Sequence, residues 1–204
     1  MVASVAVASL FLFTASALFA QGFTVSSPVV RGASQTGFDS GLKSAGRIDS
    51  MYAAKPNGPG NPLSFPFTWS GVPDGTQALA LVLDDPDAKP VLAAFGRTGD
   101  SFLHWVVADI DPSLGGLAAD ASAKNADLVQ GKNGAGNAAY TGPQPPADIP
   151  KTAKKPLIHI YRLKLYALSE PTGLSAGFTL DELSAAMEGK VLGTAQLNFA
   201  YSNK

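Results

Sequence analysis

The clearest pattern in the chain is an alternation of apolar and polar residues over residues 157–168. Successive side chains of a β-strand point to opposite faces, so this alternation predicts a strand with one face turned inward. His159 and Tyr161 share the inward parity and are expected to point the same way, toward the core or a pocket in it. The predicted inward positions are Leu157, His159, Tyr161, Leu163, Leu165 and Ala167.

Two nearly continuous apolar runs, residues 78–84 and 104–110, predict two buried strands. The first run stops at Asp84-Asp85-Pro86-Asp87, a sequence typical of a tight turn. Further short strands are predicted at residues 23–25, 65–69 and 195–201, the first of them at the edge of a sheet. The chain is therefore expected to be rich in β-strands.

The sequence predicts one helix from a capping motif at its start. Thr179 fits an N-cap and Glu182 fits the third helical position, so the two residues form a capping box. An apolar stripe at positions i, i+3, i+7 and i+11 follows, formed by Leu180, Leu183, Met187 and Val191. We therefore expect a peripheral helix that begins directly after Thr179.

The remaining segments are dominated by turn-forming residues. The chain has 21 glycines and 15 prolines, which favours many turns and short strands over long helices. Residues 55–62 predict a loop, and residues 111–156 show little periodicity, so we expect them to be functional or ordered by their own contacts. No repeat or linker divides the chain. The pattern predicts a mostly β fold, a single β-sandwich domain over residues 21–204 with one or two peripheral helices.

Composition argues against several classes of protein. The 15 basic and 16 acidic residues give a net charge of −1, which does not suggest a nucleic-acid-binding or polybasic membrane-surface protein. The chain has no cysteine, so it can form no disulfide, cysteine nucleophile or thiolate metal site. Hydrophobic residues make up 46% of the chain, enough for a substantial core.

Residues 1–20 carry no charged side chain and contain the apolar run Leu10–Phe13. This segment is typical of a secretory signal peptide, with cleavage expected after Ala17 or Ala20. It lacks the usual basic residues at its start, so an uncleaved anchor and a misassigned start codon are the alternatives. No other stretch approaches the ~20 apolar residues of a membrane span. We therefore expect an exported protein, periplasmic or secreted.

The two histidines, His104 and His159, each lie in a predicted buried strand. Asp85 and Asp87 follow the end of a third strand, and the Gly/Pro-rich residues 142–146 precede the strand of His159. Polar groups at strand ends beside such loops are typical of ligand sites. The alternative is that both histidines are hydrogen-bonded residues of the core.

Four motifs occur in an order that resembles the phosphatidylethanolamine-binding protein family, in its bacterial branch of Raf-kinase-inhibitor-like proteins (the YbhB/YbcL type). They are Leu81–Ala88, His104–Val107, Tyr140–Pro146 and His159–Tyr161. The likeness extends over roughly residues 45–202. It implies a β-sandwich of two antiparallel sheets with Greek-key-like topology, and a shallow pocket for phosphate-like groups or other small anions.

The resemblance also implies the residues of that pocket: Asp85, His104, Gly142, Pro143, Pro145, His159 and Tyr161. His104 and His159 would donate hydrogen bonds to an anion, more strongly when protonated. Asp85 would raise the basicity of a histidine and fix its tautomer, or would meet a cationic head group. Asp87 is expected to cap the turn.

The function that follows is a non-catalytic binding or regulatory protein with a small-anion pocket and no cofactor. One alternative is a protease or kinase inhibitor that contacts a protein partner through residues 147–156, a loop with three lysines. Another is a metal-dependent hydrolase in which His104, His159 and Asp85 form a facial triad. No nucleophile elbow, P-loop or H-E-x-x-H sequence supports an enzyme. Family precedent also predicts that the protein can form a homodimer.

Overall fold

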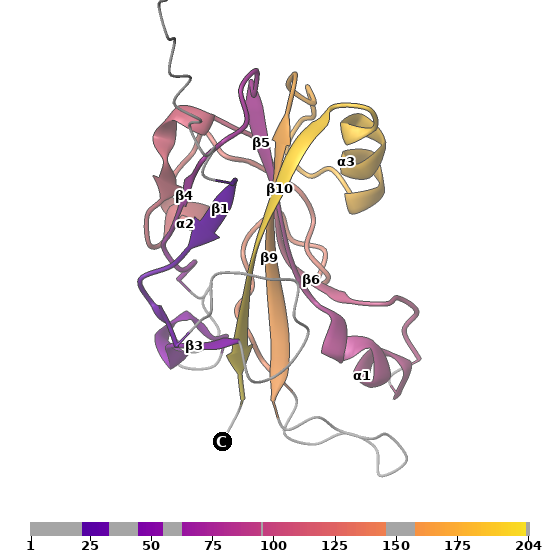
Figure 1. Ribbon diagram of the computed structural model, residues 1–204. Helices are drawn as coiled ribbons and strands as arrows, with labels where there is room; N and C mark the ends of the chain where they lie inside the picture. Colours follow the sequence, from indigo (N-terminus) through magenta and orange to yellow (C-terminus); the bar gives the residue numbers. More distant parts are fainter. Residues whose placement is uncertain (1–21, 33–44, 55–62, 95, 146–157, 203–204) are drawn as a thin grey trace, which may run out of the picture.

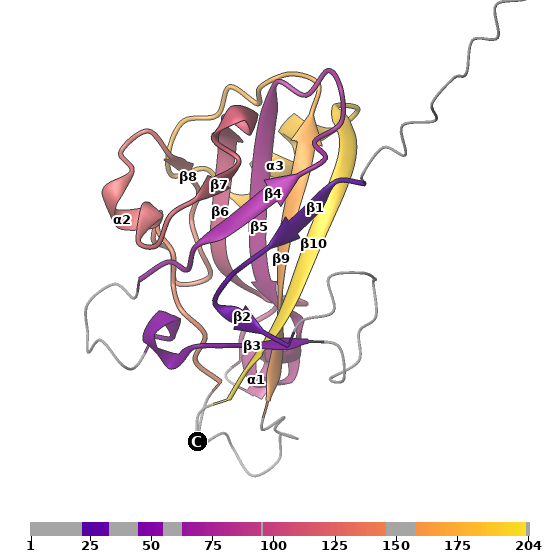
Figure 2. The same ribbon diagram turned by 60° about the vertical axis from the view of Figure 1, so that its left-hand side comes forward.

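The computed structural model describes residues 22–32, 45–54, 63–94, 96–145 and 158–202, which form two stacked β-sheets (Figures 1 and 2). The strands are β1 (Thr24–Ser26), β2 (Val30–Arg31), β3 (Gly46–Ile48), β4 (Phe67–Ser70), β5 (Ala78–Asp85), β6 (Phe102–Ile110), β7 (Gly116–Leu117), β8 (Val129–Gln130), β9 (His159–Leu168) and β10 (Val191–Tyr201). One sheet has seven strands in the order β2-β3-β10-β9-β5-β6-β8, and the other has three in the order β1-β4-β7. The predicted two-sheet β fold is confirmed.

The strand pairs of the described residues are antiparallel with one exception. β10 pairs with β3 in parallel, whereas it pairs with β9 antiparallel. The expectation of wholly antiparallel sheets is therefore wrong at this edge. β3 and β10 are far apart in the sequence, so no tight hairpin fixes their relative direction.

The predicted alternation of β9 is confirmed over the residues that the structure describes. His159, Tyr161 and Leu163 are buried, whereas Ile160 and Arg162, which alternate with them, are only half-buried. The inward face of β9 packs with the aromatic side chains of the smaller sheet and of β10. The histidine and the tyrosine therefore belong to the interior of the sandwich.

β5 is buried along its whole length because both faces of the larger sheet are covered there. Leu79, Leu81 and Leu83 point into the core between the two sheets. Ala80 and Val82 point the other way and pack with residues of α3 (Leu180–Met187) in a second core. The continuous apolar run in the sequence thus reflects a sheet and a helix on opposite faces.

Three α-helices are described, one more than the upper limit of the prediction. They are α1 (Lys89–Ala94), α2 (Ala121–Lys124) and α3. Short 3-10 turns are η1 (Ser50–Tyr52), η2 (Pro86–Ala88) and η3 (Pro112–Leu114). No helix of the described residues is long and apolar enough to cross a membrane.

The predicted capping box of α3 is confirmed. The Thr179 hydroxyl accepts a hydrogen bond from the Glu182 N–H, and the Glu182 carboxylate accepts one from the Thr179 N–H at 2.7 Å. Leu183 and Met187 are buried, as the stripe predicts. The predicted stripe continues to Val191, but α3 ends at Met187. Val191 begins β10 and is 45% exposed.

Replacing Thr179 by alanine is expected to destabilise the protein by about 1 kcal/mol, because the N-cap acceptor for the Glu182 N–H is lost. Urea denaturation would measure the change in the free energy of unfolding. Thr179→Ser is the matched control, since serine keeps the acceptor, and it should unfold like the wild type. An equal loss in both variants would contradict the capping role.

Residues 111–145 contain β7, α2, β8 and η3, none of which the sequence pattern marks. These elements have two to four residues each, too few to show a period. Gln130 orders the region, because its amide oxygen accepts hydrogen bonds from Trp105 Nε1 and Ser122 Oγ at 2.8 and 2.7 Å. The predictions on residues 1–21, 55–62 and 146–157 lie outside the described residues.

The two ends of the described chain lie at opposite ends of the long strand β10. A Cβ atom on Gly193, near the start of β10, would lie 3.8 Å from Phe23 Cδ1. Tyr201, at the end of β10, is paired with His159. Figure 1 shows the same arrangement, with β1 beside the upper part of the sandwich and the end of β10 at the bottom.

Candidate functional site

Three strands of the larger sheet bring polar residues to the same end of the sandwich. Asp85 ends β5, His104 lies near the start of β6, and His159 starts β9. The antiparallel register aligns these ends, since Asp85 is paired with Phe102 and Asp84 with Arg162. Residues that are far apart in the sequence therefore meet beside η2 and α1.

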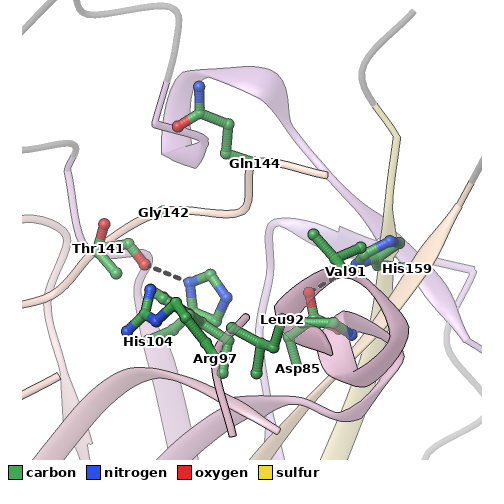
Figure 3. Close-up of a pocket in the computed structure, with 11 residues that line it drawn as sticks. Asp85, Val91, Leu92, Arg97, His104, Thr141, Gly142, Gln144 and His159 are labelled. Atoms are coloured by element: carbon green, nitrogen blue, oxygen red, sulfur yellow. Dashed lines mark hydrogen bonds and ion pairs between the residues drawn. The ribbon is translucent and has the colours of Figure 1, made fainter. Parts of the chain in front are cut away.

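A cavity of about 270 Å³ lies at this end of the sheet (Figure 3). Figure 3 shows His104 and Thr141 on one side of it, and Asp85 and His159 on the other. Apolar side chains of α1 and of the start of β6 complete the wall. The lining residues are Asp85, Ala88, Val91, Leu92, Arg97, Phe102, His104, Thr141, Gly142, Gln144 and His159.

Asp85 uses both of its carboxylate oxygens within the protein. Oδ1 accepts from the Ala88 N–H at 3.1 Å and so caps η2, and Oδ2 accepts from His159 Nδ1 at 2.7 Å. The expectation that Asp87 caps this turn is wrong. The Asp87 carboxylate instead accepts from the Ile160 N–H at 2.8 Å and ties η2 to β9. Of the two roles predicted for Asp85, the contacts match the one that fixes the histidine tautomer.

His104 is held by the backbone of Thr141. Its Nδ1 donates to the Thr141 carbonyl at 2.8 Å, and the Thr141 N–H donates to the His104 carbonyl at 2.8 Å. The residue is 4% exposed. Burial lowers the pKa of His104, although the charge of Asp85 and the hydrogen bond to Thr141 oppose this shift.

Three buried polar atoms have no hydrogen-bond partner among the described residues: His104 Nε2, His159 Nε2 and the Tyr161 hydroxyl. Tyr161 does not line the cavity. Its ring lies inside the core, 5.1 Å from the His104 ring and stacked on Phe199 at 5.3 Å. Burial and then the charge of Asp85 raise the pKa of Tyr161, so its hydroxyl stays protonated at ordinary pH.

The predicted rim residues do not share one position. Gly142 lines the cavity, whereas Pro143 and Pro145 are buried residues that do not line it. The Pro143 carbonyl accepts from the Ala54 N–H at 3.1 Å, which anchors the segment. A Cβ atom on Gly142 would lie 2.5 Å from the Tyr52 carbonyl oxygen, so only glycine fits this close approach of two backbones.

The sequence pattern did not mark Arg97, which also lines the cavity. Its guanidinium donates to the Gly134 carbonyl at 2.7 Å and lies 5.9 Å from the centre of the Phe102 ring. That ring in turn contacts the His104 ring, with a centroid distance of 4.9 Å. Arg97 lies between α1 and β6 in a segment without periodicity, so nothing in the sequence alone pointed to it.

The facial metal triad of the alternative hypothesis is not formed. No group of three or more potential ligands among the described residues is arranged to hold a metal ion. His104 and His159 direct their Nδ1 atoms to Thr141 and Asp85 instead. Their two Nε2 atoms have no partner among the described residues, and the side chain of Arg97 lines the same cavity.

Comparisons with known proteins show the family and agree with the fold. The family model described as phosphatidylethanolamine-binding protein matches residues 39–202. A UPF0098 protein of Methanothermobacter thermautotrophicus is 36% identical over 155 residues, which cover 74% of this chain and 88% of the relative.

Two crystal structures are similar over nearly the whole of their own chains. A phosphatidylethanolamine-binding protein homolog from Chlamydia trachomatis has a TM-score of 0.69 and 26% identity, and the match covers 90% of this chain and 99% of that one. YbcL of Escherichia coli has a TM-score of 0.66 and 25% identity, with coverage of 89% and 99%.

Proposed function

This chain belongs to the phosphatidylethanolamine-binding protein family, and we propose that it is a non-catalytic binding protein whose cavity takes a small anion. One observation carries the proposal: both cavity histidines are buried and have an Nε2 atom without a partner among the described residues. Buried polar groups are nearly always hydrogen-bonded, so a ligand that reaches these atoms is favoured. A volume of about 270 Å³ suits a phosphate-sized group with a small substituent.

Arg97 supports an anionic ligand. Its guanidinium is charged at every physiological pH, and it is the only lysine or arginine among the described residues that line the cavity. The negative charge of Asp85 is already bonded to His159. Burial keeps the pKa of His104 low, so Arg97 is the constant source of positive charge.

The proposal includes export to the periplasm or the cell exterior, which rests on the apolar segment at residues 1–20. The inhibitor alternative invokes residues 147–156, which lie outside the described residues. No contact of the described residues favours that alternative over the anion site.

An NMR titration of the wild type with phosphate, phosphoethanolamine and a nucleotide tests the site. We expect chemical-shift changes centred on His104, His159 and Arg97. Arg97→Gln should weaken phosphate binding by about tenfold or more, because a hydrogen bond to a charged group is worth about 1.5–3 kcal/mol.

Lys164→Gln is the matched control for loss of a positive charge, since Lys164 lies on the outward parity of β9, away from the cavity. This variant should bind phosphate like the wild type. Shifts that leave both histidines unaffected while residues elsewhere respond would refute the proposed site.

A further inference from the structure

The hydrogen-bond role of His104 is determined by its fixed contact. The Thr141 carbonyl can only accept, so the Nδ1 atom of His104, 2.8 Å away, carries the hydrogen. The second bond, from the Thr141 N–H to the His104 carbonyl, keeps the two residues side by side. A neutral imidazole has a single N–H, so its Nε2 atom, which has no partner among the described residues, presents a lone pair and can only accept.

His159 is oriented by the same kind of contact. Asp85 accepts from the Ala88 N–H with one oxygen and lies 2.7 Å from His159 Nδ1 with the other. A carboxylate has no hydrogen to donate, so Nδ1 is the donor and Nε2 is the free nitrogen of this ring as well. In both rings, therefore, Nε2 is the nitrogen without a hydrogen-bond partner among the described residues.

This arrangement creates a conflict for a fully ionised anion. The oxygens of such an anion only accept hydrogen bonds, and the neutral His104 ring offers a lone pair there. A hydrogen bond between them needs one additional proton, on Nε2 or on the ligand. In the free protein, burial of the ring keeps that proton away.

The charged and titratable groups around His104 determine when the proton binds. The Asp84 carboxylate is bonded to Arg162 and the Asp85 carboxylate to His159, while the Tyr161 hydroxyl stays protonated. Arg97 contacts the Phe102 ring, which packs against His104, and adds a positive charge that has no acidic partner among the described residues. The positive charge of Arg97 favours an anionic ligand, and the negative charge of that ligand in turn favours protonation of the nearby ring.

We propose that the cavity binds an oxyanion together with one proton, which lies between His104 Nε2 and an oxygen of the ligand. The proton comes from solvent, and no covalent bond changes. This inference rests on the anion site proposed above and adds its ligand preference and its regulation. Oxyanions that carry an acidic hydrogen near neutral pH, such as phosphate monoesters, are favoured. Binding of a permanently ionised anion weakens as pH rises.

Isothermal titration calorimetry with inorganic sulfate tests the proton directly, since sulfate stays a dianion between pH 7 and 9. Titrations at pH 8 in two buffers of different ionisation enthalpy should give an uptake of about one proton per sulfate. The Kd should rise about tenfold for each pH unit, as linkage to one proton requires.

The possible failures are distinguishable. Sulfate binding with no proton uptake and a constant Kd from pH 7 to 9 would overturn the proton linkage and leave the anion site intact. No binding of either sulfate or phosphate would overturn the anion site, and the proton linkage with it.

Imidazole ¹⁵N spectra of the wild type provide a second test that needs no variant. At pH 8 the free protein should show His104 protonated on Nδ1 alone, and saturating sulfate should protonate Nε2 as well. A free ring protonated on Nε2 alone would overturn the proposal. His104→Gln supplies its own N–H, so its sulfate affinity should be weaker at pH 7 and nearly independent of pH.

Discussion

Replacing Asp85 by alanine is expected to lower the free energy of unfolding by about 3–5 kcal/mol, because it removes one partner of a buried pair. The side chains of His159 and Asp85 are 1% and 5% exposed. The alanine variant leaves His159 Nδ1 without its acceptor and the Ala88 N–H without its cap. The first loss acts between β5 and β9, and the second acts on η2, which connects β5 to α1, so the wall of the cavity should loosen with the fold.

Urea denaturation of Asp85→Ala, Asp85→Asn and the wild type would measure this effect. Asparagine keeps one acceptor oxygen and nearly the same volume, so it should cost clearly less than alanine. Asp87→Ala serves as a second comparison, because Asp87 holds a single backbone N–H at 2.8 Å. A loss below about 1 kcal/mol for Asp85→Ala would show that the buried pair does not stabilise the native state.

Replacing His104 by phenylalanine is expected to weaken phosphate binding by about 10- to 100-fold, since a hydrogen bond to a charged ligand contributes about 1.5–3 kcal/mol. Phenylalanine has a ring of similar size and can keep the contacts with Phe102 and Tyr161. It cannot bond the Thr141 carbonyl or the ligand. The variant should therefore stay folded and lose mainly affinity.

Tyr161→Phe is the matched control for this experiment. Tyr161 is fully buried and does not line the cavity, so removal of its hydroxyl should change the Kd for phosphate by less than about threefold. Titration calorimetry would compare the two variants at the same pH. A normal Kd in His104→Phe, with binding lost in Tyr161→Phe, would place the ligand on the tyrosine instead.

The parts of the fold that the sequence predicted are those with a long regular pattern. β9 alternates over its described residues, and α3 begins at its capping box. The elements between residues 111 and 145 are too short to show any period, and contacts such as those of Gln130 order them. The parallel pairing of β10 with β3 depends on the three-dimensional arrangement of the sheet, which no local pattern encodes.

The sequence predicted the burial of some candidate side chains and missed several of their contacts. The inward parity of β9 placed His159 correctly in the interior. Asp85 and Asp87 are two residues apart in one turn, so sequence alone could not decide which of them caps it. That choice depends on where His159 and Ile160 lie in space. Arg97 reaches the cavity from a turn, through a contact with the distant Gly134 carbonyl.

The position of the first and last described residues along β10 determines how the protein can be attached to a surface. Gly193, beside Phe23, and Tyr201, beside His159, are separated by eight residues of strand, or about 25 Å. A tether joined ahead of β1 would start near the end of the sandwich opposite to the cavity. A tag after Tyr201 would start next to the ligand site. Immobilised binding assays should therefore attach the protein through its N-terminal side.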